Sequence, residues 1–299
     1  MKLNTQNSTF KTMQSIAYLG PPGTYSEIAA LAFGGEATTF LPLASMPAVV
    51  TAVETGAASS GVLPIENALE GSVTTTLDLL IHETALRIAA ETVVAIRHNL
   101  VGRAGITLTE IEVLYGHPQS LGQCRRFVER CLPNVATVAS LSNSAAPAEA
   151  LADTRPAAAI ATGRAAALLG AHILAHDIQD RASNVTRFIA IGKHDAAPTG
   201  DDKTSFCFGF DREDRAGSLV EALDVLAQAQ INMTKLESRP AKEMFGQYIF
   251  LVDINGHRAD LHVAAALTQI KQRTGFFKVF GSFPVWRENE NGSGQAGEP

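Results

Sequence analysis

Two short polar groups in the sequence have the residue types needed to bind and polarise an oxygenated anion. Glu66 and Asn67 follow the apolar run 62–65, which predicts that they lie at the end of a strand buried on both faces. Thr186 and Arg187 stand directly before a second apolar run. A threonine hydroxyl can donate a hydrogen bond, and a guanidinium binds a carboxylate through two parallel hydrogen bonds. Thr186 and Arg187 together could therefore bind and polarise an oxygenated anion, although a strand that begins with these residues also fits an ordinary structural role.

The segment after Asn67 predicts a helix whose first turn could receive the same anion. Gly71 and Ser72 offer a flexible residue and an N-cap hydroxyl, and the apolar residues over 77–81 mark a helix with one apolar face. Free N–H groups at a helix N-terminus bind carboxylates or phosphates. An ordinary loop between a strand and a helix has the same pattern, so this stretch alone leaves both interpretations open.

Several predicted strands in the first 190 residues end on a polar cluster. Units of strand, loop and helix repeat along the chain, beginning with a strand at 15–19 and a helix capped by Ser26, and a later helix runs through Cys124. This order is typical of mainly parallel α/β folds, in which ligands bind at the carboxyl ends of the strands. The clusters predict that a common cleft is lined by Thr24, Gln119, Ser142 and Ser144.

A polar, Pro- and Gly-containing segment at 192–203 predicts the start of a second domain. The elements after it follow the order strand, helix, strand, strand, helix, strand between residues 204 and 283. This βαββαβ order is that of a ferredoxin-like fold, which serves both enzymes and small regulatory modules. Residues 1–14 and 288–299 are predicted to be tails.

Composition excludes several classes of protein. The chain has 299 residues, 46% of them hydrophobic, which suits about two globular domains. The formal net charge is −6 and no stripe of Lys and Arg occurs, so no nucleic-acid partner is predicted. No stretch has the length or apolarity of a signal peptide or a membrane span, which predicts a cytoplasmic protein without a membrane partner.

Neither a metal nor another cofactor is predicted. Cys124, Cys131 and Cys207 have neither disulfide nor zinc spacing and are expected to be reduced. His172 and His176 are four residues apart and would share one face of a helix, but no carboxylate stands at a suitable spacing beside them. Solvated or core histidines are the favoured interpretation.

Five motifs in fixed order resemble those of the prephenate dehydratase family, and the segment 203–286 resembles the regulatory ACT domain that follows in this family. The motifs are 18–26, 61–67, 70–73, 117–119 and 184–188, and the two ACT motifs are 217–220 and 237–240. The resemblance covers residues 15–287 and implies a monofunctional enzyme. It implies a catalytic domain at 15–192, formed by two α/β lobes around a cleft with chain crossings near 96 and 173, and an ACT domain at 203–287.

The resemblance implies a carbon–oxygen lyase that converts prephenate to phenylpyruvate, CO2 and water in phenylalanine biosynthesis. It places the leaving-group role on Thr186, with Glu66, Asn67 and Gln119 in the cleft. A buried, protonated Glu66 is an open rival as proton donor. The candidates for substrate binding are Arg187, Ser142, Ser144, Thr24 and Phe188.

Feedback by phenylalanine is a further implication of the resemblance. In similar ACT domains two segments form an effector site between paired subunits, which predicts a homodimer or homotetramer. The first segment starts a helix and contains Gly217, Ser218, Leu219 and Val220. The second segment ends a strand and contains Glu237, Ser238, Arg239 and Pro240. Ser218 replaces the usual Ala. Two alternatives stay open, arogenate dehydratase and a non-catalytic two-lobed protein that binds small carboxylates.

Overall fold

The structure is a computed structural model that describes residues 15–210, 215–241 and 247–288. The chain divides into two compact units. The first contains the residues up to 79 together with 93–189, and the second contains 80–92 together with the residues from 190 onward. Among the described residues, no helix is long and apolar enough to cross a membrane.

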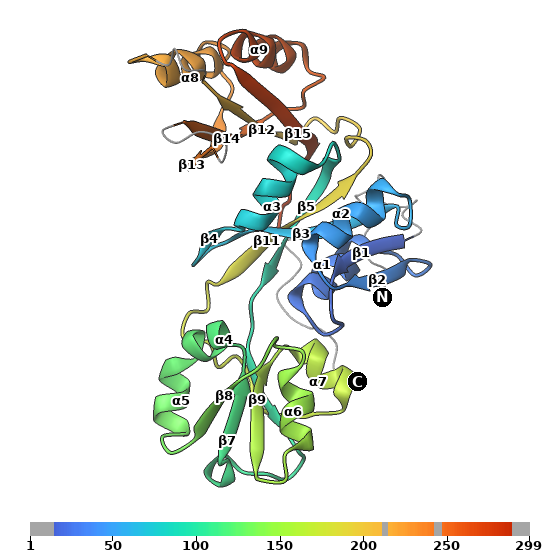
Figure 1. Ribbon diagram of the computed structural model, residues 1–299, viewed down its shortest axis with the longest axis vertical. Coiled ribbons are helices and arrows are strands. Elements are labelled where there is room, and N and C mark those ends of the chain that lie inside the picture. The colour runs from blue at the N-terminus through green and yellow to red at the C-terminus, as the bar shows by residue number, and fades with distance from the viewer. Residues whose placement is uncertain (1–14, 211–214, 242–246, 289–299) are drawn as a thin grey trace. The chain divides into compact units, whose positions relative to one another are not determined.

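The first lobe is built on a six-stranded sheet with the order β2-β1-β3-β11-β5, and β4 pairs with β3 (Figure 1). Strand β1 runs parallel to both β2 and β3, as the repeated strand–helix units predict. The strands are β1 (Ser15–Leu19), β2 (Thr39–Leu43), β3 (Ser60–Asn67), β4 (Gly71–Ser72), β5 (Arg87–Ala95) and β11 (Val185–Gly192). The helices are α1 (Tyr25–Phe33), α2 (Met46–Glu54), α3 (Thr74–Asp78) and the π-helix at Leu79–Glu83.

Two helix starts in this lobe differ from the prediction. Helix α1 is capped by Thr24, whose side chain accepts a hydrogen bond from the Glu27 amide, and not by Ser26. Ser72 lies in strand β4 opposite Glu66, so it does not cap α3. The prediction of a side-chain cap at Ser72 was wrong because Ser72 is a strand residue of the β3–β4 hairpin, where it pairs with Glu66. Helix α3 has only five residues, and its N-cap residue, Val73, provides no side-chain hydrogen bond.

The second lobe is a five-stranded sheet with the order β10-β6-β9-β7-β8 and helices on both faces. Alternate residues of β9 face opposite cores, one containing Ala157, Ala159 and Ala161 and the other Ala158 and Ile160. Figure 1 shows α6 and α7 on one face and α4 and α5 on the other. The strands are β6 (Asn99–Gly102), β7 (Val113–Gly116), β8 (Ala136–Ala139), β9 (Ala157–Ala161) and β10 (His172–Ala175). The helices are the 3-10 turn Leu108–Glu110, α4 (Pro118–Gln123), α5 (Arg125–Cys131), α6 (Ala146–Ala152) and α7 (Gly163–Leu169).

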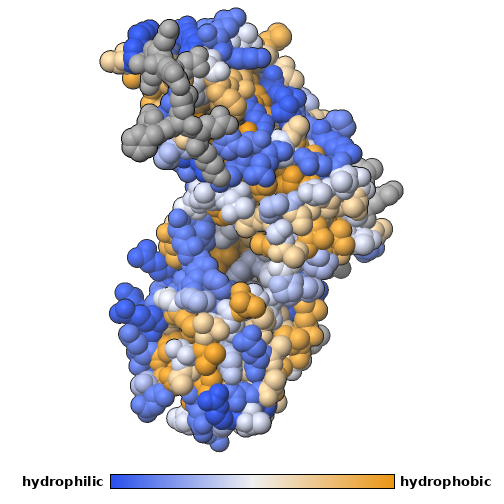
Figure 2. All heavy atoms as spheres, in the orientation of Figure 1, coloured by the Kyte–Doolittle hydropathy of each residue, from blue (hydrophilic) through white to orange (hydrophobic). Residues whose placement is uncertain are grey.

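Cys124 separates two helices where the sequence predicted one. Its backbone leaves the helical region, at φ −113° and ψ 15°, while its side chain is fully buried in the core of the second lobe. The break turns α5 away from α4. Figure 2 shows that the surface over α5 is hydrophilic, in agreement with the exposed Arg125–Glu129 pair on this helix.

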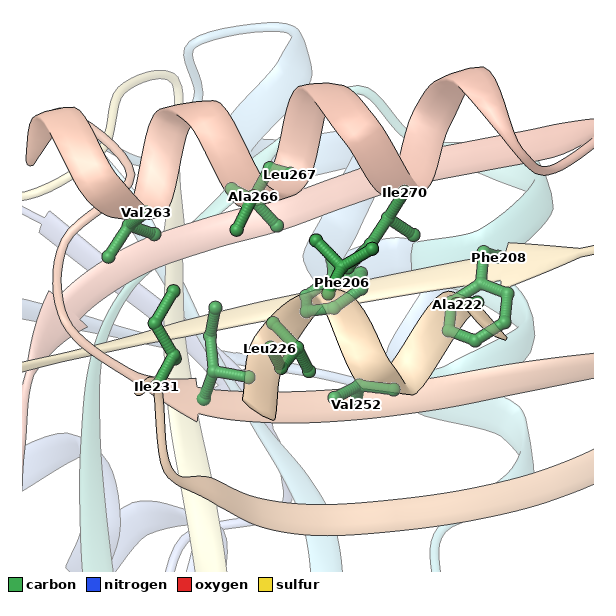
Figure 3. Close-up of a cluster of buried hydrophobic side chains, with 12 residues drawn as sticks. Phe206, Phe208, Ala222, Leu226, Ile231, Val252, Val263, Ala266, Leu267 and Ile270 are labelled. Carbon is green, nitrogen blue, oxygen red and sulfur yellow. The ribbon is translucent and has the colours of Figure 1, made fainter. Parts of the chain in front are cut away.

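The second unit contains the predicted βαββαβ domain, with an antiparallel sheet in the order β13-β14-β12-β15. Its core lies between this sheet and two helices, and Figure 3 shows Phe206 and Leu226 pointing into it. The elements are β12 (Asp202–Gly209), α8 (Ser218–Gln228), β13 (Met233–Pro240), β14 (Tyr248–Asn255), α9 (Leu261–Gln272) and β15 (Phe276–Pro284).

Residues 80–92 pack against strand β15 within the second unit. The Lys278 ammonium donates to the carbonyl oxygens of Ile81 at 3.0 Å and Thr84 at 2.7 Å. Arg87 donates to the Val279 carbonyl oxygen. The segment that leads from α3 into β5 is therefore held by the C-terminal domain.

Candidate active site

The side chain of Asn67 fixes the hydroxyl of Thr186. Asn67 is the last residue of β3, and its Nδ2 donates to Thr186 Oγ1 at 2.8 Å and to the Val185 carbonyl oxygen at 3.2 Å. Its Oδ1 accepts from the amides of Leu69 at 2.9 Å and Glu70 at 3.2 Å, so the orientation of the Asn67 amide is determined. Because Thr186 Oγ1 accepts from Asn67, the hydroxyl hydrogen is directed elsewhere.

Arg187 lies beside Glu66. The distance between Arg187 Nη1 and Glu66 Oε2 is 3.8 Å, and the exposed fractions of the two side chains are 14% and 38%. Glu66 is therefore partly exposed and has a cation beside it, and its role as proton donor stays a prediction.

Helix α4 of the second lobe reaches the turn after β3. Gln119 Nε2 donates to Glu70 Oε1, so the structure brings Gln119 to the Asn67 turn. Gln123 lies one turn further along the same helix and donates to the same oxygen at 3.4 Å. Asn184 Nδ2 in turn donates to Gln123 Oε1 at 3.3 Å.

Sequence analysis did not select Glu70, Gln123 or Asn184 as site residues. The spacing of Gln119 and Gln123 places both on one helix face, and this spacing could have indicated the second glutamine. Asn184 stands two residues before Thr186 within a quoted motif. Glu70 opens the quoted motif 70–73, but its contact with helix α4 depends on how the two lobes meet, which the sequence does not show.

Ser142 and Ser144 are hydrogen-bonded to each other rather than to the Asn67 group. Their hydroxyl oxygens are 3.0 Å apart, and Ser142 Oγ also accepts from the Ala145 amide at the start of α6. The neighbouring Asn143 accepts from Ser120 of α4 at 2.6 Å. The loop formed by residues 142–144, called the serine loop below, is therefore anchored to the helix that carries Gln119.

Thr24 belongs to a loop of the first lobe that packs against the second lobe. A Cβ on Gly23 would lie 2.9 Å from Ala165 Cβ and 3.3 Å from Ser144 Cβ, so the loop backbone packs directly on the second lobe. The Thr162 hydroxyl donates to the Gly23 carbonyl oxygen at 2.6 Å. Thr24 itself is occupied as the cap of α1, and its role in substrate binding stays a prediction.

Phe188 lies in the core of the first sheet with an exposed fraction of 2%, and its binding role also stays a prediction. His172 lies in strand β10 and not in a helix, so the spacing of His172 and His176 does not place them on one helix face. Over the described ranges, no three His, Cys, Asp or Glu side chains gather as a metal site.

The two effector segments lie at the start of α8 and along the edge strand β13. Gly217 has φ +98° and precedes the helix, while Ser218 Oγ donates to the Arg215 carbonyl oxygen at 2.9 Å. Val220 is 69% exposed, and Glu237 lies 3.3 Å from Lys235. The hydroxyl that distinguishes this chain at position 218 is thus used in a local turn.

The fold and the site define a two-lobed α/β enzyme followed by a ferredoxin-like domain of the ACT type. The family model of prephenate dehydratase matches residues 16–196, and that of the ACT domain matches residues 209–272. A bifunctional chorismate mutase/prephenate dehydratase of Aquifex aeolicus is 42% identical, and the match covers 90% of this chain and 73% of that protein. The chain belongs to the prephenate dehydratase family.

Two solved structures are similar over nearly the whole chain. One is a prephenate dehydratase of Arthrobacter aurescens in complex with L-Phe, with a TM-score of 0.82 and 36% identity over 91% of this chain and 90% of that one. The other is GqqA, described as a novel type of quorum quenching acylase, with a TM-score of 0.80 and 29% identity over 91% of this chain and 98% of that one.

Proposed function

We propose that the chain converts prephenate to phenylpyruvate, CO2 and water, with Thr186 hydrogen-bonding the departing hydroxyl group. The ring carboxylate leaves as CO2, the electrons of the broken C–C bond enter the ring, and the C4–O bond breaks. The departing hydroxide takes a proton and becomes water. Family membership and the full-length likeness to a prephenate dehydratase support this reaction.

The main support for this role of Thr186 is the hydrogen bond that Asn67 Nδ2 donates to Thr186 Oγ1 at 2.8 Å. In the part of the chain that the structure describes, the Thr186 hydroxyl has no acceptor, and only 8% of the residue is exposed. A donor of fixed direction stabilises charge that develops on a leaving oxygen without reorganising at the moment of reaction. Aromatisation of the ring supplies the driving force.

Arg187 and the serine loop are proposed to bind the two carboxylates of the substrate. The Arg187 guanidinium is planar and rigid, and its side chain has an exposed fraction of 14%. A charge-assisted hydrogen bond to a carboxylate is strong in such a setting. Glu66 orients Arg187 in this proposal rather than delivering a proton. Gln119 is held by its hydrogen bond to Glu70, and in this proposal it is the residue of the second lobe that contacts the substrate.

We further propose that phenylalanine binds the ACT domain between two subunits and regulates the enzyme. The support is the ACT match and the complex of a similar prephenate dehydratase with L-Phe. A homodimer or homotetramer follows from a site shared by two copies. The cytoplasmic location predicted from the sequence stays a prediction.

The test is turnover of prephenate, followed by the appearance of phenylpyruvate, with arogenate as a parallel substrate. Higher kcat/KM with prephenate is expected, and preference for arogenate would redefine the substrate. Because one similar structure is described as an acylase, hydrolysis of an N-acyl substrate is measured alongside. Hydrolysis without turnover of prephenate or arogenate would contradict the proposal.

A further inference from the structure

A chain of hydrogen bonds links the buried ring of His98 to the Asn67–Thr186 pair. His98 Nε2 lies 2.9 Å from Gln123 Oε1, and Asn184 Nδ2 donates to that same oxygen at 3.3 Å. Asn184 Oδ1 accepts from Asn67 Nδ2 at 3.0 Å. His98 stands where the chain enters the second lobe, and its exposed fraction is 1%.

The direction of each bond follows from Glu70. An ionised carboxylate only accepts, so Gln123 must present its Nε2 to Glu70, at 3.4 Å, and its Oε1 to His98 and Asn184. Asn184 must then present Nδ2 to Gln123 and Oδ1 to Asn67. The same order leaves Asn67 Nδ2 as a donor to Thr186.

The order requires a hydrogen on His98 Nε2. Tyr25 donates its hydroxyl hydrogen to the Arg97 carbonyl oxygen at 2.6 Å, while its oxygen lies 3.4 Å from His98 Nδ1. Burial lowers the pKa of His98 below its ordinary value, which favours the neutral ring. A neutral ring that donates from Nε2 leaves Nδ1 without a hydrogen.

We propose that His98 is a positioning residue, which donates from Nε2 to Gln123 and so fixes the orientation of Gln123, Asn184 and Asn67 around the Thr186 hydroxyl. The proposal rests on the proposed function of Thr186. Without this donor, the Gln123 amide can turn and offer its oxygen elsewhere, and the order that directs the Thr186 hydrogen toward the substrate is lost. Misplacement of a reacting group by about 1 Å can cost about 100-fold in rate.

Three variants separate this role from simple packing. His98→Leu removes the donor and is expected to lower kcat about 10- to 100-fold with little change in KM. His98→Gln places an amide nitrogen near the position of Nε2 and is expected to keep most of the wild-type kcat. Tyr25→Phe is the matched control, since it disturbs the same junction but spares the bond from Nε2, and near-wild-type kcat is expected.

Equal kcat for His98→Leu and the wild type would overturn the proposal. So would a His98→Gln variant as slow as His98→Leu, or a Tyr25→Phe variant as slow as both, because ring packing would then explain the loss. If the His98→Leu chain fails to fold, the position of the hydrogen on the His98 ring in the wild-type protein decides the proposal.

The tautomer of His98 gives a readout that needs no activity. Nitrogen-15 NMR of the full chain at neutral pH is expected to show His98 protonated at Nε2 and bare at Nδ1, with His98→Gln used to assign the signals. A hydrogen on Nδ1 alone would overturn the proposal even in an active enzyme. If the wild type fails to convert prephenate, the proposed function fails, while the NMR result still decides whether His98 directs the chain of hydrogen bonds.

Discussion

Lys203 and Glu91 form an ion pair that joins the first strand of the ACT domain to β5. Lys203 Nζ lies 2.7 Å from Glu91 Oε1, and the exposed fractions of the two side chains are 15% and 3%. The Trp286 amide donates to the same carboxylate at 3.1 Å. Within the second unit, the C-terminal domain is therefore held to the first part of β5 by a buried charge pair.

Breaking this pair is expected to destabilise the protein strongly. Glu91→Gln leaves the Lys203 ammonium buried without its counter-charge, which costs about 3–5 kcal/mol. Replacing both residues, as Glu91→Gln with Lys203→Met, removes the buried charge and is expected to cost less than the sum of the two single changes. Urea unfolding of the four chains measures the cycle. Additive losses would show that the two side chains are not coupled.

Gly281 is a second contact at which the ACT domain touches the segment 80–92. A Cβ there would overlap the Ile88 carbonyl oxygen and lie 2.7 Å from the Ile88 nitrogen. Because both are backbone atoms, Gly281→Ala is expected to lower stability by about 1–3 kcal/mol. Gly35→Ala is the matched control, since nothing lies within 4 Å of its Cβ. Equal unfolding midpoints for the two variants would contradict the contact.

The sequence was sufficient to predict the local elements but not how the lobes meet. The apolar periods and turn residues placed the strand at 15–19 correctly and the first strand of the second domain, expected at 204–210, within two residues of Asp202–Gly209, because both signals are local. Residues 80–92 carry no pattern that assigns them to the second unit, since that depends on contacts such as Lys278 with Thr84. The cap that Thr24 provides for α1 was likewise not predicted, and its role in substrate binding stays a prediction.

Within the candidate site, residue types drew attention to Asn67 and Thr186, the resemblance of the motifs assigned their roles, and the structure then showed their hydrogen bond. Spacing alone left the proton-donor role of Glu66 open, because it gives neither exposure nor the distance to Arg187. The roles of Glu70 and His98 depend on contacts between segments far apart in the sequence.

Arg187→Lys is expected to raise KM for prephenate about 10-fold or more, with a smaller change in kcat. An ammonium cannot form the two parallel bonds that a guanidinium makes to a carboxylate, and a bond to a charged group is worth about 1.5–3 kcal/mol. Arg97→Lys serves as control, since that side chain is 59% exposed and pairs with Asp177. A fall in kcat at unchanged KM would contradict the binding role.

Phenylalanine is expected to bind the full-length protein with a change in substrate affinity of about 5- to 150-fold. Glu237 belongs to the second effector segment, and we expect its carboxylate to contact the ammonium group of phenylalanine. Glu237→Gln removes this negative charge and should weaken binding in calorimetric titration. Asp224 lies on α8, and its side chain accepts a hydrogen bond from Gln228. Asp224→Asn is the control and should leave binding unchanged. Equal affinity of the Glu237→Gln and wild-type proteins would place the effector elsewhere.

The most direct test of the central claim is the kcat of Thr186→Ala with prephenate, measured beside Thr186→Ser. A fall of about 10²- to 10⁴-fold in kcat is expected for Thr186→Ala with a modest change in KM, since the hydroxyl acts on the departing oxygen in the transition state. Thr186→Ser keeps the hydroxyl and should keep most of the activity. Near-wild-type kcat in Thr186→Ala would contradict the account and remove Thr186 from the mechanism.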